Sequence, residues 1–188
     1  MQTKEAKKLS YRKKEEFLNN KNLWDLRHAC IENIASLIEE SQVLLENGFY
    51  PRAFLLGYMA LEEMGKLLLV SDCITGVASE NEMKKGFHDH NHKVGYWHNT
   101  CELIPDPSRK TTEATIKYSG DRFKYLFEMR NKSAYVNYVG DDYSVCSPQR
   151  EITEENAIEM LNHVSKGFTK LLMFEDINER IGSKAFYK

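Results

Sequence analysis

The chain has 188 residues, of which 41% are hydrophobic and 29% are charged, and its formal net charge is -2. This length and composition predict one ordinary globular domain and exclude an intrinsically disordered chain. The small net charge provides no global field that attracts nucleic acid, so only a local basic patch could bind it.

The first 20 residues are basic and polar, and we expect them to form an arm or a short helix ahead of one helical domain over residues 21–188. They lack the apolar centre of a signal peptide. The longest apolar run, over residues 53–70, is interrupted by charges and is therefore not a membrane span. We expect a cytoplasmic protein without membrane contact. The four cysteines are widely spaced, which favours buried thiols over a zinc or redox motif.

Two apolar patterns in the first third of the chain predict an antiparallel helical hairpin. From Leu23 to Leu44, apolar residues recur at steps of three and four, with one longer gap, and Asn47-Gly48 is a helix stop. Pro51 opens a second helix over about residues 52–71. This second helix is apolar on nearly all sides, so it should lie at the centre of the fold.

The rest of the chain predicts two more long helices and one small β-hairpin. Residues 72–106 look less regular, with at most a short helix over 94–103, and Asp106-Pro107 marks the start of a helix running to about Arg130. Alternation near residues 135–146 predicts a β-hairpin, which should pack on the helices because an isolated hairpin is marginal. Thr153 caps a last helix that ends near residues 180–182.

Three charged residues lie inside the apolar second helix: Glu62, Glu63 and Lys66. As an exposed helical ion pair they would contribute only about 0.2–0.5 kcal/mol. Within an apolar helix they are partly desolvated, and such charges need partners. They can therefore organise a polar pocket or a subunit interface, or act directly in catalysis.

A second polar cluster combines three histidines with a lysine: His88, His90, His92 and Lys93. In an extended backbone, alternate histidines would share one face and could bind a metal. No cysteine lies close enough to complete a zinc site, so we predict neither a metal nor a cofactor. The remaining interpretations are a phosphate-binding or base-supplying segment and a solvated loop.

The third cluster begins with Arg130-Asn131 and, after four intervening residues, reaches Tyr135. It resembles the HEPN motif, in which an Arg, often followed by a polar residue, precedes a His by four to six residues. Residues 48–66, 87–93 and 129–136 also resemble, in order and spacing, segments of the AbiV branch of that superfamily. This resemblance extends over about residues 23–180 and implies a mainly α fold, a HEPN-like bundle of four to six helices.

The resemblance also implies a function, that of a phage-defence effector in abortive infection. Many HEPN proteins are metal-independent endoribonucleases that dimerise so that two Arg motifs face one cleft. Arg130 would then bind a phosphate and Asn131 would orient the substrate. RNA or the translation machinery would be the target, and a phage-encoded protein the activator.

Tyr135 departs from the motif, because a tyrosine with an ordinary pKa of about 10 is a poorer base than a histidine near 6.5. Three interpretations of the protein remain open: a weaker nuclease, a nuclease that uses another base such as a His of residues 88–92, and a binding protein without nuclease chemistry. Tyr135 packing on the bundle and Arg130 as a surface charge are the structural interpretations. The other functions considered are sequestration of a translation factor or phage protein, and partnership with a nucleotidyltransferase.

Overall fold

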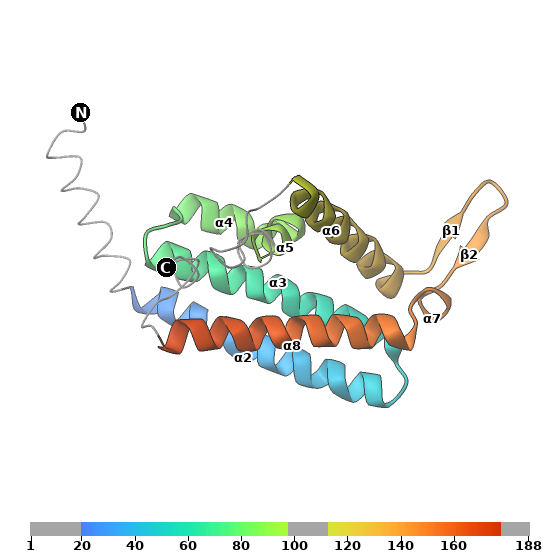
Figure 1. Cartoon of the computed structure of the whole chain (residues 1–188), viewed down its shortest axis with the longest axis horizontal. Coiled ribbons are helices and arrows are strands. Elements are labelled where there is room, and N and C mark those ends of the chain that lie inside the picture. Colours follow the sequence, from blue (N-terminus) through green and yellow to red (C-terminus); the bar gives the residue numbers. More distant parts are fainter. Residues whose placement is uncertain (1–19, 98–112, 178–188) are drawn as a thin grey trace, which may run out of the picture.

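The computed structural model describes residues 20–97 and 113–177, with side chains over 20–97 and 121–173. The predicted mainly α fold with one small β-hairpin is confirmed (Figure 1). Over these ranges the chain forms seven helices and two strands: α2 Lys21–Glu46, α3 Tyr50–Ile74, α4 Glu80–His88, α5 His90–Trp97, α6 Glu113–Ala134, β1 Asn137–Val139, β2 Ser144–Cys146, α7 Pro148–Glu151 and α8 Glu154–Ile177.

The predicted hairpin of α2 and α3 is confirmed. Asn20 caps α2 by accepting a hydrogen bond of 3.1 Å from the backbone of Asn22. Gly48, with φ of 76°, reverses the chain, and Pro51 occupies the first turn of α3. Glycine adopts this left-handed conformation without a steric penalty, and proline at a helix start loses no hydrogen bond.

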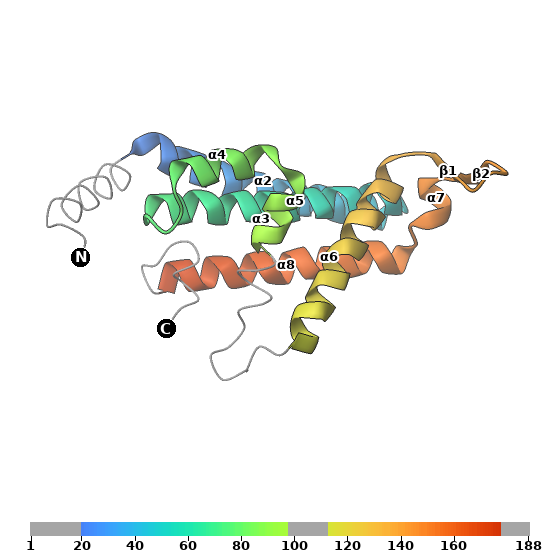
Figure 2. The ribbon, with the colours of Figure 1, turned by 90° about the horizontal axis from the view of Figure 1, so that it is seen from above.

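Helix α3 is the centre of the fold, as its apolar composition predicts. It packs against α2, α5, α6 and α8, and its largest side chains, including Phe54 and Tyr58, are almost completely buried. Helices α2, α3 and α8 run alongside one another, whereas α6 crosses them steeply (Figures 1 and 2). None of the helices over the described ranges has both the length and the apolarity needed to cross a bilayer.

The His-rich segment is more regular than expected. It forms two short helices, α4 and α5, which break at Asp89. Ser79 and Glu82 form a capping box at the start of α4, and the Asp89 carboxylate accepts hydrogen bonds from the backbone of Asn91 and His92 at 2.9 and 3.2 Å. These caps favour helix over the extended conformation that an alternating-His metal site requires. The solvated-loop interpretation is also wrong, because the segment is helical.

Helix α6 continues beyond the predicted end at Arg130, as far as Ala134. Arg130 and Asn131 therefore lie in its last turns. The predicted helix start at Asp106-Pro107, the basic segment of residues 1–19 and the predicted end of the last helix lie outside the described residues. The predicted cap at Thr153 is confirmed, since its hydroxyl accepts from the backbone of Asn156 at 3.3 Å.

The β-hairpin forms as predicted, with Tyr138 opposite Val145 and a turn at Gly140. The expectation that it packs on the helices is wrong, because it projects from the end of the bundle (Figures 1 and 2). The short helix α7, which was not predicted, packs there against α6 and α3. Six apolar or aromatic side chains of this segment are each at least 60% exposed: Tyr135, Val136, Tyr138, Val139, Tyr143 and Val145.

Candidate functional site

Glu62 of α3 lies at the centre of a polar cluster between α3 and α5. The residue is only 7% exposed. Its Oε2 atom lies 2.8 Å from Nδ1 of His90 and 3.3 Å from Nζ of Lys93. His90 and Lys93 are three residues apart on α5, and this spacing brings both side chains to the same helix face. The structure thus joins residues from two clusters that are 28 positions apart in the sequence.

Lys93 is the buried cation of this cluster, with 4% of its surface exposed. A buried carboxylate and a buried ammonium compensate each other, because either one alone would carry a large desolvation cost. Close helix packing brings them together. A Cβ atom on Gly65 would lie 2.0 Å from the carbonyl oxygen of Lys93, so only glycine permits this approach of α5 to α3.

Glu63 and Lys66 form a separate ion pair on α3. The Lys66 ammonium lies 5.8 Å from the ring centre of Phe87, at cation–π distance. Burial, and next the Glu63 carboxylate, raise the pKa of Cys30 to about 11. Cys30 is therefore a protonated, unreactive thiol. The three charges of the sequence motif are thus divided between two clusters.

Arg130 is half-buried near the end of α6, and its Nη1 atom donates a hydrogen bond of 3.1 Å to Oδ1 of Asn131. Its carbonyl oxygen accepts a bond of 2.7 Å from Ser133. Tyr135 follows the helix, and its backbone N–H donates to the carbonyl oxygen of Asn131 at 3.2 Å. The Tyr135 residue is 60% exposed, so the interpretation as an aromatic residue packed on the bundle is wrong.

Tyr58 lies on α3 one turn before Glu62 and was not singled out from the sequence. It is fully buried, and its hydroxyl has no hydrogen-bond partner among the described residues. Burial raises the pKa of Tyr58, the Glu62 carboxylate raises it further and the Arg130 guanidinium lowers it. The charges of both regions therefore act on one hydroxyl. Tyr58 precedes Glu62 by four residues, which places them on one face of α3.

The other two histidines of the His-rich segment, His88 and His92, are not part of the Glu62 cluster. His88 is exposed at the end of α4. His92 stacks on the ring of Tyr96, with the ring centres 6.1 Å apart. In the described ranges, no group of three or more His, Cys, Asp or Glu side chains is arranged to hold a metal ion.

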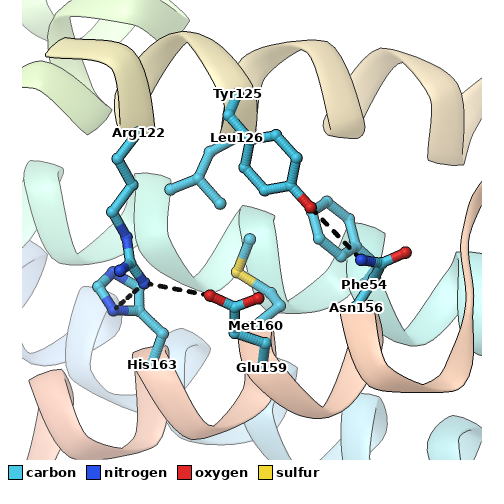
Figure 3. Close-up of a pocket in the computed structure, with 8 residues that line it drawn as sticks. All are labelled: Phe54, Arg122, Tyr125, Leu126, Asn156, Glu159, Met160 and His163. Atoms are coloured by element: carbon cyan, nitrogen blue, oxygen red, sulfur yellow. Dashed lines mark hydrogen bonds and ion pairs between the residues drawn. The ribbon is translucent and has the colours of Figure 1, made fainter. Parts of the chain in front are cut away.

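A second polar group lines a small cavity between α3, α6 and α8 (Figure 3). Nη2 of Arg122 lies 3.5 Å from Nδ1 of His163 and 3.7 Å from Oε1 of Glu159. Tyr125 accepts a hydrogen bond of 3.3 Å from the Asn156 amide. The cavity measures about 10 Å³, which is room for one water molecule at most. It is therefore a packing feature and does not accommodate a substrate.

A comparison with known protein families gives a match over most of the chain. The sequence model of the HEPN-type AbiV family matches residues 22–169, which is most of the chain. No curated protein and no solved structure matches significantly. The matched residues include the α2–α3 hairpin, the Glu62 cluster and the end of α6 with Arg130. The chain therefore belongs to the AbiV family of HEPN-type abortive-infection proteins.

Proposed function

We propose that this protein is a phage-defence effector that acts on RNA in the cytoplasm of infected cells. The observation that carries the proposal is the position of Arg130. Its guanidinium is held by Asn131, and no carboxylate in the described part of the chain forms an ion pair with it. Its remaining N–H groups can therefore bind a phosphate.

The chemistry that fits this arrangement is endonucleolytic cleavage of RNA without a metal. A guanidinium fork neutralises the charge that develops on the phosphate oxygens as the 2′-oxygen attacks phosphorus. The protein acts as a homodimer in which two Arg130 segments face one cleft. The exposed β-hairpin follows α6, the helix that carries Arg130, and supplies apolar surface for that contact.

Infection of cells that carry the gene tests this function. We expect protein synthesis to stop and RNA to be cleaved with the wild type, but not with Arg130→Ala. Arg150→Ala is the matched control, because Arg150 is an exposed arginine on α7 and should leave the response unchanged. Equal cleavage with Arg130→Ala and wild type would contradict the catalytic role.

A second candidate function is sequestration of a translation factor or a phage protein without catalysis. The exposed Tyr135 and the apolar hairpin favour it, because large exposed apolar patches mark interaction surfaces. If sequestration is the function, the double variant Arg130→Ala, Tyr135→Phe should still arrest growth. Loss of the arrest in that variant would exclude sequestration by this surface alone.

The effector must be inactive until infection, so we propose that a phage-encoded protein activates it. Affinity purification of the tagged full-length chain from infected cells should recover a phage protein that uninfected cells lack. Recovery of host proteins alone would contradict this trigger.

A further inference from the structure

RNA cleavage by internal attack needs a base, and the residue at the expected His position is Tyr135. At neutral pH a phenol with an ordinary pKa of about 10 is protonated and accepts a proton poorly. The described structure holds another candidate on α5, where His90 contacts Glu62.

The contact with Glu62 determines which ring nitrogen of His90 is available to accept a proton. Nδ1 of His90 lies 2.8 Å from the Glu62 carboxylate. A neutral ring that donates its Nδ1 proton to this carboxylate leaves Nε2 as a proton acceptor. The His90 side chain is 57% exposed, whereas that of Glu62 is 9% exposed. An accessible imidazole is thus oriented by a buried carboxylate, which is the arrangement that positions histidine bases in hydrolases.

Lys93 makes this arrangement stable when the ring is neutral. Its ammonium lies 3.3 Å from the same Oε2 atom of Glu62. The buried carboxylate already has a compensating charge, so it does not require a second cation at His90. Glu62, Lys93 and His90 are the titratable groups that form this contact within the described residues.

His90 contacts α3 at Glu62, and Arg130 lies on α6, which also packs against α3. Burial raises the pKa of Tyr58, which lies one turn before Glu62 on α3, the Glu62 carboxylate raises it further and the Arg130 guanidinium lowers it. The base candidate and the phosphate-binding candidate thus lie on two helices that both pack against α3. His88 and His92 have no contact with Glu62, so they lack this orientation.

We propose that His90 is the general base of RNA cleavage and that Glu62 is its positioning residue; this rests on the ribonuclease function proposed above. The 2′-hydroxyl proton passes to Nε2 of His90, the bond from O2′ to phosphorus forms, and the bond from phosphorus to O5′ breaks. The leaving O5′ takes a proton from water, and His90 later returns its proton to water. The products are a 2′,3′-cyclic phosphate and a 5′-hydroxyl.

Chemical rescue tests the assignment, with full-length protein purified from infected cells, labelled cellular RNA and EDTA. We expect His90→Ala to lose about 10²–10⁴-fold in rate, the usual contribution of a general base. Added imidazole should restore part of the rate in His90→Ala, because the side chain is exposed and its removal leaves an open site. His88→Ala, which removes an exposed histidine two residues away, should cleave like the wild type.

Glu62 is tested by combining variants. Glu62→Gln should slow cleavage when His90 is present. In the His90→Ala background, the cleavage rate without imidazole should be the same with Glu or Gln at position 62. Full activity of His90→Ala with an inactive Arg130→Ala would overturn the base and leave the proposed function standing. Absence of cleavage by the wild-type protein would overturn both. Loss in His90→Ala that imidazole does not restore would also overturn the base.

Discussion

Gly65 controls how closely α5 approaches α3, and its replacement by alanine gives a quantitative test of the cluster. In a helix interior, Gly→Ala is normally stabilising by about 1 kcal/mol. Here the new Cβ atom would lie 2.0 Å from the carbonyl oxygen of Lys93 and 2.6 Å from its carbonyl carbon. An ordinary contact of about 3.5 Å requires α5 to withdraw by about 1.5 Å, since the neighbour is backbone and cannot rotate away.

Overpacking of this kind costs about 1–3 kcal/mol, and a backbone clash belongs at the upper end of that range. After the gain in helix propensity, we expect Gly65→Ala to lower the free energy of unfolding by about 1–2 kcal/mol. Urea denaturation followed by circular dichroism measures it. Gly95→Ala on α5 is the matched control, because a Cβ there meets nothing within 4 Å. Gly95→Ala should raise the free energy of unfolding by about 0.5–1 kcal/mol. Equal stability of the two variants would show that the close approach of α5 to α3 does not depend on Gly65.

Three further predictions concern buried and capping groups. Lys93→Ala removes the buried cation beside Glu62 and leaves the carboxylate with only the exposed His90 imidazole, so it should cost up to about 3–5 kcal/mol in urea denaturation. The exposed Lys84→Ala should change stability by about 0.5 kcal/mol or less. Tyr58→Phe removes a buried hydroxyl that has no hydrogen-bond partner within the described ranges, so the urea midpoint of the variant should equal or exceed that of the wild type. A clearly lower midpoint would reveal an unrecognised hydrogen bond. Hydrogen bonds from Ser79 lower the pKa of Glu82 below 4.5, so the cap is intact above that pH and is lost as pH falls through the lowered value. The protection of α4 amides, measured as the exchange rate relative to the intrinsic rate at each pH, should fall there, and it should not depend on pH in this way with Glu82→Gln.

The parts of the fold that sequence predicted are those set by local signals. The α2–α3 hairpin follows from periodicity, the glycine at residue 48 and the proline at residue 51. The break between α4 and α5 also has a local cause, the cap at Asp89. It was not predicted, because the polar composition of residues 79–93 gives no clear helical pattern of apolar residues. The exposure of the hairpin depends on α7 occupying the end of the bundle, and no local pattern contains that information.

The candidate site was predicted less completely, because its parts meet through tertiary packing. Glu62 and Glu63 are neighbours in sequence, yet a step of 100° around α3 gives them different partners. The pairing of Glu62 with His90 requires the close helix approach at Gly65. Tyr58 carries a weaker signal, a hydroxyl inside an otherwise apolar turn, which indicates a polar neighbour.

We propose that Arg130 serves metal-independent RNA cleavage during infection. Sequencing of 2′,3′-cyclic-phosphate RNA ends tests it most directly, in infected cells carrying the wild type or Arg130→Ala. We predict that new cyclic-phosphate ends accumulate at discrete sites with the wild type and stay at background with Arg130→Ala. The same end profile in both, or new ends that carry a 5′-phosphate, would contradict metal-independent cleavage that depends on Arg130.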